Sequence, residues 1–138
     1  MIYVYTDGAS RGNPGKGAAA FVLVRGKEII DQQALFLGYC TNNEAEYNAV
    51  IEGLKRASLY EKNEVLVRSD SKLVINQLLG LWQVKNYRMK LLRDKALGFA
   101  KAFNKVSFEH VPRSDPWVSR ADYMCNSILD SVETQQRT

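Results

Sequence analysis

Two hydrophobic periods alternate along the chain and predict a mixture of strands and helices. Short β-prone runs are separated by turns or by longer segments in which apolar residues recur every three or four positions. The run at residues 17–24 is apolar on both faces, which places it at the centre of a sheet. Strands are expected at residues 2–6, 17–24, 28–37, 64–69 and 105–111.

The segments with the longer period predict four helices. The first begins with a capping box, in which Thr41 is the N-cap and Glu44 reaches back to it. Its apolar stripe then runs from Tyr47 to Leu54. The other three are expected at residues 71–80, at residues 88–103 and from about Ser119 onward.

The resulting order, βββαβααβα, predicts the fold class. Strands separated by helices need crossover connections, so the fourth and fifth strands are expected to run parallel to the first. This gives an α/β fold with a five-stranded mixed sheet and helices on both faces. No break in composition interrupts the chain, so we expect one domain at residues 1–133 and a polar C-terminal tail at residues 134–138.

Composition narrows the class of protein. The 138 residues are 46% hydrophobic and 25% charged, as in ordinary soluble domains, without a long apolar run or an export leader. Cys40 and Cys125 lack CxxC spacing, and the single histidine, His110, is expected to be a structural residue of the fifth strand. These features argue against a zinc site or a disulfide framework and favour a cytoplasmic protein that does not contact a membrane.

Positive charge is concentrated in one segment. The formal net charge is +4, and residues 85–105 carry seven lysines and arginines with Asp94 as their single acid. Such a run is often only a solvated helix face. With Trp82 and Tyr87 at its start, it also suits a groove for nucleic acid, a polyanionic partner.

An acidic residue follows the first strand and opens a glycine-rich segment. Asp7 comes directly after residues 2–6, and residues 8–15, with three glycines and a proline, are expected to form a turn. Glycine lets a backbone approach a phosphate closely, so this turn suits a metal or phosphate site. An Asp–Gly pair after a strand is also a common plain turn.

Three more acids occupy matching places. If residues 64–69 form a parallel neighbour of the first strand, Asp70 emerges at the same edge of the sheet as Asp7. Glu46 and Asp122 each stand one position from an apolar stripe, near the start of a helix. Singly, each acid is explained more simply as a turn residue, an N-cap or a favourable charge near a helix start. Together they would repel one another unless a cation lay between them.

Four carboxylates without a histidine or thiol suit Mg²⁺ or Mn²⁺. Two such ions about 3.5–4 Å apart can activate a water and stabilise the leaving oxygen of a phosphodiester. This chemistry needs no protein nucleophile, and the sequence shows neither a Cys–His nor a Ser–His arrangement that would supply one.

Four segments resemble the signature blocks of the type 1 ribonuclease H family: TDGASRGNPG at 6–15, TNNEAEYNAVIEGL at 41–54, SDSKLVINQL at 69–78 and RADYMCNSIL at 120–129. They follow the family's order over nearly the whole chain. The resemblance implies an endoribonuclease that hydrolyses the RNA strand of RNA–DNA hybrids, leaving 5′-phosphate and 3′-hydroxyl ends. It also implies that Asp7, Glu46, Asp70 and Asp122 are catalytic and hold two Mg²⁺ or Mn²⁺ ions with substrate bound.

Ten positions are predicted to bind the hybrid, some from the same resemblance and those in the basic segment at residues 85–105 from their charge. Asn42 has donors and acceptors suited to a base edge or a ribose 2′-hydroxyl, and Thr41 would reach a phosphate of the DNA strand besides capping its helix. The protein is expected to act as a monomer, with double-stranded RNA open as a second substrate. The positions are Gly8, Ser10, Asn13, Thr41, Asn42, Asn43, Lys72, Lys85, Arg88 and Lys90.

The chain departs from the family pattern in three places. Residues 80–88 are short, so the basic protrusion of some members is missing and this is a compact form. The loop at residues 112–119 has no histidine, which leaves Arg113 as the candidate catalytic group for the scissile phosphate and Asp115 as an alternative carboxylate. Tyr39 stands where some relatives use an arginine in the DNA-phosphate pocket.

Two other functions are compatible with the fold. One is a catalytically silent module that binds hybrids, and the other is a different metal-dependent nuclease, such as a junction resolvase or a transposase-like core. The signature blocks argue against the second. The four acids argue against the first, because binding alone gains nothing from negative charge that faces a phosphate.

Overall fold

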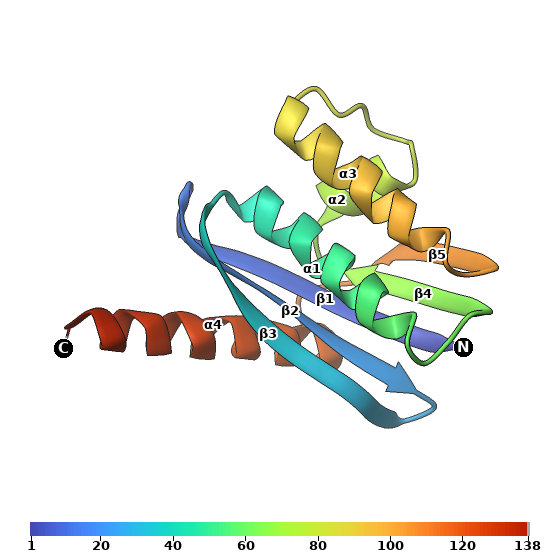
Figure 1. Cartoon of the computed structure of the whole chain (residues 1–138), viewed down its shortest axis with the longest axis horizontal. Coiled ribbons are helices and arrows are strands. Elements are labelled where there is room, and N and C mark those ends of the chain that lie inside the picture. Colours follow the sequence, from blue (N-terminus) through green and yellow to red (C-terminus); the bar gives the residue numbers. More distant parts are fainter. Residues whose placement is uncertain (138) are drawn as a thin grey trace.

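The computed structural model describes residues 1–137, which form one sheet of five strands and four helices (Figure 1). The strands are β1 (Ile2–Gly12), β2 (Gly15–Arg25), β3 (Glu28–Cys40), β4 (Glu64–Ser69) and β5 (Lys105–His110). The helices are α1 (Asn42–Ala57), α2 (Lys72–Leu78), α3 (Tyr87–Ala100) and α4 (Pro116–Arg137).

The sheet is mixed, as predicted. Its strand order is β3-β2-β1-β4-β5, with β1, β2 and β3 joined as antiparallel hairpins. β4 pairs in parallel with β1, and β5 pairs in parallel with β4, because helical crossovers return the chain to the same end of the sheet. The carboxyl ends of β4 and β5 therefore lie side by side at the same end of the sheet.

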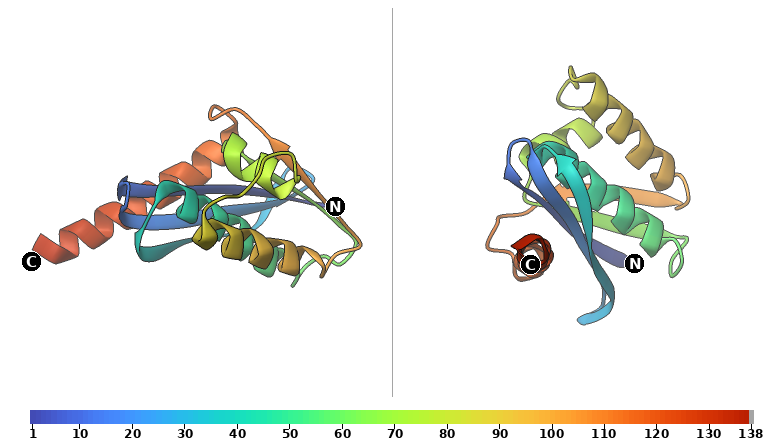
Figure 2. Two further views of the ribbon diagram at one scale, coloured as in Figure 1. Left: turned by 90° about the horizontal axis from the view of Figure 1, so that it is seen from above. Right: turned by 60° about the vertical axis from the view of Figure 1, so that its left-hand side comes forward.

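Helices cover both faces of the sheet (Figure 2), with α1, α2 and α3 on one side and α4 on the other. Alternate residues of β1 supply the two cores, because successive side chains of a strand point to opposite faces. Val4 packs with Tyr47 and other residues of α1, whereas Tyr5 packs with Ala121 of α4. None of the helices within residues 1–137 is both long and apolar enough to cross a membrane.

The predicted turn after Asp7 is wrong. β1 continues to Gly12 and pairs with β2 along its whole length, so the reversal occurs at Asn13–Pro14. Only residues 2–5 of β1 pair with β4. Asp7 therefore lies just beyond the point where β1 and β4 separate, which is why a mid-strand residue can still meet the end of β4. β3 likewise runs to Cys40, three residues further than predicted.

The start and end of α4 also differ from the prediction. Asp115 caps the helix, since its Oδ1 accepts hydrogen bonds from the backbone N–H groups of Trp117 (2.9 Å) and Val118 (3.0 Å). The helix consequently begins at Pro116 rather than near Ser119, and Asp115 is a cap rather than an alternative metal ligand. Residues 134–137, predicted as a tail, continue the helix, and Thr138 lies outside the described residues.

α3 is shorter than predicted and is covered less completely by the core. Asn86 caps it, and its Oδ1 accepts a hydrogen bond from the Met89 N–H at 3.1 Å. Ala96 is its one fully buried residue within the described chain, while Met89, Leu92 and Phe99 are partly buried against the core. Most of the helix surface, including its lysines, is therefore left to solvent.

Candidate active site

Three of the four predicted acids meet at one place. Asp7 lies on β1, Glu46 in the second turn of α1 and Asp70 directly after β4. A carboxylate oxygen of each lies within 4.8 Å of an oxygen of the other two. Asp7 is only 5% exposed, and the other two are half-buried. Of the four carboxylates expected from two strands and two helix starts, the three from β1, α1 and β4 therefore form a tight group.

Asp122 lies on the wall of the same cleft but outside this group of three. Because α4 begins at Pro116, Asp122 stands in the second turn of the helix rather than in the first. Its carboxyl is within hydrogen-bond reach of the Asp7 carboxyl. The cleft has a volume of about 440 Å³. It is lined by Asp7, Gly8, Ala9, Ser10, Asn42, Asn43, Glu46, Asp70, Ser71, Arg113, Asp122 and Asn126.

Gly8 lets α1 approach β1 closely enough for Glu46 to reach Asp7. A Cβ atom on Gly8 would lie 2.2 Å from the carbonyl carbon of Ala45 and 2.4 Å from the backbone nitrogen of Glu46. The backbone N–H of Gly8 also favours the charged form of the Glu46 carboxyl and so acts to lower its pKa. The close approach that the sequence predicts for a phosphate at this glycine is therefore made by the protein's own helix.

The surroundings of the three acids disfavour their ionised forms. Burial raises the pKa of Asp7, and the negative charge of the neighbouring Glu46 raises it further. Burial also raises the pKa of Glu46, although a hydrogen bond from Asp7 partly offsets this. Burial raises the pKa of Asp70 as well, against the opposing charge of Arg113. Without a cation, the cluster retains protons that bulk carboxylates would release.

One oxygen of the cluster has no partner of its own. Glu46 Oε2 is buried and accepts no hydrogen bond from residues 1–137. Leaving a buried polar atom unsatisfied costs about 1–3 kcal/mol, which a ligand can recover. The potential metal ligands around this atom are carboxylate oxygens, the ligand type that Mg²⁺ and Mn²⁺ prefer. The residues present therefore fit a divalent cation bound through oxygen.

Two basic side chains border the acids. Arg113 is exposed, lines the cleft and lowers the pKa of Asp70 against the effect of burial. His110 is exposed at the end of β5, opposite Ser69 in the parallel register. His110, the last residue of β5, lies in the fifth strand as predicted, and it is also one of the groups that act on the pKa of Asp70. The β4–β5 register places it there, and sequence periodicity does not reveal that register.

The tip of the β1–β2 hairpin is bound to the start of α1. Asn42 Oδ1 accepts hydrogen bonds from the backbone N–H (2.9 Å) and the hydroxyl (3.0 Å) of Ser10. Asn13 Oδ1 accepts one from the Asn42 N–H at 3.1 Å. Asn43, next to them, borders both the acid cleft and a neighbouring hollow. Four of the predicted hybrid-binding residues therefore form one polar surface beside the acids.

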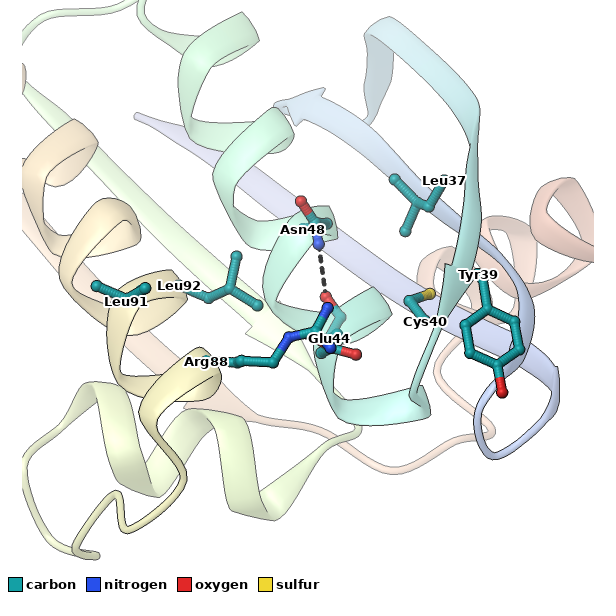
Figure 3. Close-up of a pocket in the computed structure, with 8 residues that line it drawn as sticks. All are labelled: Leu37, Tyr39, Cys40, Glu44, Asn48, Arg88, Leu91 and Leu92. Carbon is teal, nitrogen blue, oxygen red and sulfur yellow. Dashed lines mark hydrogen bonds and ion pairs between the residues drawn. The ribbon is translucent and has the colours of Figure 1, made fainter.

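A second groove lies between β3, α1 and α3 (Figure 3). Its larger part, about 360 Å³, is lined by Glu44 of α1, Arg88 of α3 and Tyr39 of β3. Arg88 Nε lies 3.0 Å from Glu44 Oε2, and Tyr39 is 73% exposed. A further hollow of about 320 Å³ adjoins it. That hollow is lined by Asn13, Thr41, Asn43, Glu44, Asn86, Arg88 and Met89.

Thr41 has a structural role whatever else it does. Its hydroxyl accepts a hydrogen bond from the Glu44 N–H at 3.1 Å, and Glu44 Oε1 accepts one from the Thr41 N–H at 2.9 Å. The predicted capping box is therefore confirmed. Because Glu44 also binds Arg88, this cap links the start of α1 to α3.

The predicted lysines lie outside the acid cleft. Lys72 begins α2, Lys85 is in the loop before α3 and Lys90 is in the first turn of that helix. All three are exposed, and none forms an ion pair within residues 1–137. Their charge is therefore available to a partner.

Sequence reasoning missed two polar side chains near the acids. Asn126 lines the cleft, and its Nδ2 lies 3.3 Å from Asp122 Oδ1. Its spacing of four residues from Asp122 on a helix was a usable signal. Ser69, the buried last residue of β4, acts to lower the pKa of Glu46, and only the tertiary structure reveals that the two residues are close.

Comparison with known proteins agrees with this arrangement. Residues 5–127 match the family model described as reverse transcriptase-like. The chain is 32% identical to the Ribonuclease H of Caldicellulosiruptor saccharolyticus over 99% of its own length and 98% of that protein's length. The chain belongs to the type 1 ribonuclease H family. It is also 38% identical to the Ribonuclease HI of Halobacterium salinarum over 95% of its own residues, but spans 65% of that relative's length.

Solved ribonuclease H structures share the fold closely. The crystal structure of LC11-RNase H1 in complex with an RNA/DNA hybrid superposes with a TM-score of 0.89. That alignment covers 96% of this chain and 99% of the other, with 31% sequence identity. The five-stranded mixed sheet and its helices are therefore those of the ribonuclease H family.

Proposed function

We propose that this chain is a metal-dependent endoribonuclease that hydrolyses the RNA strand of RNA–DNA hybrids. The observation that carries the proposal is the convergence of Asp7, Glu46 and Asp70 within 4.8 Å around an unpartnered carboxylate oxygen. The relatives named as ribonucleases H and the hybrid bound by LC11-RNase H1 support the choice of reaction and substrate.

In this proposal, Asp7, Glu46, Asp70 and Asp122 together hold two Mg²⁺ or Mn²⁺ ions when the hybrid is bound. Held there, the ions would supply an activated water and stabilisation of the leaving oxygen, which would give 5′-phosphate and 3′-hydroxyl ends. These carboxyls would release their protons to hold the cations, because positive charge would offset the repulsion and desolvation that raise their pKa values.

Arg113 is proposed as the catalytic cation of the chain itself. Its guanidinium is exposed on the cleft wall and acts on Asp70. A planar guanidinium can bind two oxygens of a phosphate at once. Arg113 would therefore orient the scissile phosphate and neutralise charge that develops on it.

Asn42 is proposed to recognise the RNA strand by donating a hydrogen bond from its side-chain amide. Its Oδ1 already accepts two hydrogen bonds from Ser10, so its Nδ2 is the atom left to meet substrate. An amide donor suits the oxygen of a ribose 2′-hydroxyl or a minor-groove acceptor of a base. Gly8, Asn13 and Asn43 would complete this surface by shape and by backbone and amide contacts.

The DNA strand is proposed to lie over the groove of Figure 3 and the adjoining hollow. Thr41 and Arg88 would contact a phosphate there, helped by the N-terminal end of α1. Tyr39 offers an exposed aromatic ring in place of a cation, so it suits a sugar face better than a phosphate. Lys72, Lys85 and Lys90 would add longer-range attraction.

The direct test uses a labelled RNA–DNA hybrid with Mg²⁺, with Mn²⁺ and with EDTA. Single-stranded RNA, double-stranded RNA and double-stranded DNA of the same sequence run in parallel, together with a branched DNA. We expect cleavage of the hybrid's RNA strand with metal and none with EDTA. Hybrid binding without cleavage under either metal would support the silent binding module, and preferred cleavage of branched DNA would support another nuclease of this fold.

Replacing Lys85 and Lys90 together with alanine is expected to weaken hybrid binding without slowing the chemical step. Both are exposed, are free of ion pairs within residues 1–137 and release counterions when they meet phosphates. We expect KM to rise about 5- to 10-fold near 50 mM salt, kcat to stay nearly constant and the salt slope to fall by about two.

The matched control for this pair is Lys27 and Lys62, two exposed lysines at the opposite end of the sheet. Their replacement removes the same charge and is expected to change KM less than about twofold. Equal effects of the two double variants would mean that net charge, rather than docking on α3, controls binding.

We also propose that one chain is the active unit and that it works in the cytoplasm. All four acids come from a single chain, and both cysteines are free and buried. Cleavage activity that is proportional to protein concentration, together with a monomeric mass in solution, would support the first part.

A further inference from the structure

The tip of the β1–β2 hairpin contacts helices on both faces of the sheet. Ser10 faces α1 and binds Asn42, as described above. Arg11, the next residue, faces the opposite side because side chains alternate along a strand. There it meets α4, with Nη2 2.6 Å from Asp130 Oδ1 and Nη1 2.9 Å from Glu133 Oε2. The two carboxylates raise the pKa of Arg11, and its guanidinium is therefore ion-paired with α4.

The same guanidinium reaches towards the acid cleft through Asn126. Arg11 Nη2 lies 3.3 Å from both the backbone oxygen and the Oδ1 of Asn126. The Asn126 Nδ2 in turn donates to the backbone oxygen (3.1 Å) and to Oδ1 (3.3 Å) of Asp122. A continuous path of hydrogen bonds therefore runs from the hairpin tip to a carboxylate of the candidate active site.

This path orients both amide atoms of Asn126. An amide that accepts from Arg11 on its oxygen must present its NH₂ group to Asp122, so the donor is directed at the carboxylate. Asp122 is the acid that stands outside the tight group of three, and it lies on a helix that packs across a different face from α1. Its position relative to the other acids therefore depends on how α4 is held.

We propose that Arg11 and Asn126 are positioning residues that set the Asp122 carboxylate for metal binding, an inference that rests on the proposed function. Arg11 fixes α4 to the β1–β2 hairpin, which also binds α1. Asn126, which contacts Arg11, then orients Asp122 through its hydrogen bond. Groups that orient a metal-binding carboxylate through hydrogen bonds typically change metal affinity or activity by about 10- to 100-fold when removed.

Asn126→Ala is the decisive variant, measured first in the metal-free full-length protein by calorimetric titration with Mn²⁺. We expect the dissociation constant for Mn²⁺ to rise about 10-fold, with a parallel rise in the Mn²⁺ concentration that half-saturates hybrid cleavage. The melting temperature without metal is expected to change little, because Asn126 is exposed and alanine favours a helix. Arg11→Met is expected to weaken Mn²⁺ binding about threefold.

Glu133→Gln is the matched control, because it removes one ion pair of Arg11 and leaves the path through Asn126 intact. It is expected to leave Mn²⁺ affinity unchanged. In an Asp122→Asn background, Asn126→Ala should have no further effect, since the group that it positions is already altered. Wild-type affinity in Asn126→Ala, or an undiminished loss in the Asp122→Asn background, would overturn the inference.

A wild-type protein that binds no Mn²⁺ with or without hybrid would overturn the proposed metal site, and this inference with it. Wild-type binding together with an unaffected Asn126→Ala variant would overturn the inference alone. The two failures are therefore distinguishable in one set of titrations.

Discussion

Asp7→Asn is expected to reduce hybrid cleavage by about 10³-fold or more. Asp7 is the most buried of the four acids and contributes an oxygen to the group of three within 4.8 Å. An amide of the same shape removes one negative charge from the site that would bind the cations. The measurement is kcat/KM on a labelled hybrid at saturating Mg²⁺, compared with wild type.

The same variant is expected to make the metal-free protein more stable at neutral and alkaline pH. Burial, with the charge of Glu46, raises the pKa of Asp7 well above the ordinary aspartate value of 3.8. As the pH rises past that value, the unfolded chain releases this proton and the folded chain retains it, so stability falls. Below about pH 4 the Asp7 carboxyl is protonated in both the folded and the unfolded chain, so the free energy of unfolding is highest there. It decreases as the pH rises.

Chemical denaturation in EDTA at pH 5 and pH 8 measures this effect. Because asparagine carries no charge, we expect Asp7→Asn to exceed wild type by about 2 kcal/mol at pH 8 and by less at pH 5. Saturating Mg²⁺ is expected to stabilise wild type more than the variant. A variant that is less stable than wild type at pH 8 without metal would contradict the electrostatic account of the cluster.

Asp31→Asn is a control with the opposite sign. Asp31 is a partly buried carboxylate outside the site, and its oxygens accept hydrogen bonds from Arg56 (2.9 Å) and Tyr60 (2.8 Å). Burial raises its pKa, but these hydrogen bonds outweigh burial and lower it overall. Its carboxylate therefore stabilises the fold above about pH 4, so the variant is expected to lose stability at pH 8 and to retain cleavage activity.

Gly8→Ala is expected to destabilise the fold by about 3 kcal/mol and to lower cleavage at least about 10²-fold. The added methyl group would lie 2.2 Å from the carbonyl carbon of Ala45, which belongs to the backbone of α1 and cannot rotate away. The helix must move, and Glu46 would move with it away from Asp7. Denaturation and cleavage assays on the same preparation measure both effects.

Gly98→Ala is the matched control. Gly98 lies within α3, and a Cβ atom there meets nothing within 4 Å. Alanine is expected to stabilise this helix by about 0.5–1 kcal/mol and to leave cleavage unchanged. If Gly8→Ala folds with wild-type stability and cleaves normally, then the close packing of α1 on β1 does not position Glu46.

Much of the fold was predictable because the local signals were strong and consistent. The alternation of strand-like and helical segments predicted the parallel placement of β4 and β5 and the helices on both faces. The capping box of Thr41 and Glu44 predicted the start of α1. The boundaries failed where two local signals competed. The glycines after Asp7 indicated a turn, but pairing with β2 extended β1 to Gly12.

The acids show where sequence reasoning succeeds and where it ends. The sequence predicted that four acids meet, and three of them, Asp7, Glu46 and Asp70, lie within 4.8 Å of one another. Asp7 reaches the end of β4 from the middle of its strand rather than from a strand end, because β1 and β4 separate after residue 5. The sequence by itself thus determined the order of the elements, the identity of the acids and the oxygen-only chemistry of the site.

Only the tertiary structure decided how these parts are held. Gly8 packs against α1, Asp115 is a cap, and Arg11 with Asn126 connects the hairpin to Asp122. Each of these contacts joins residues whose meeting depends on packing between separate elements, or on which of several neighbours takes a hydrogen bond. Periodicity and spacing carry no information on that choice, because they describe one element at a time.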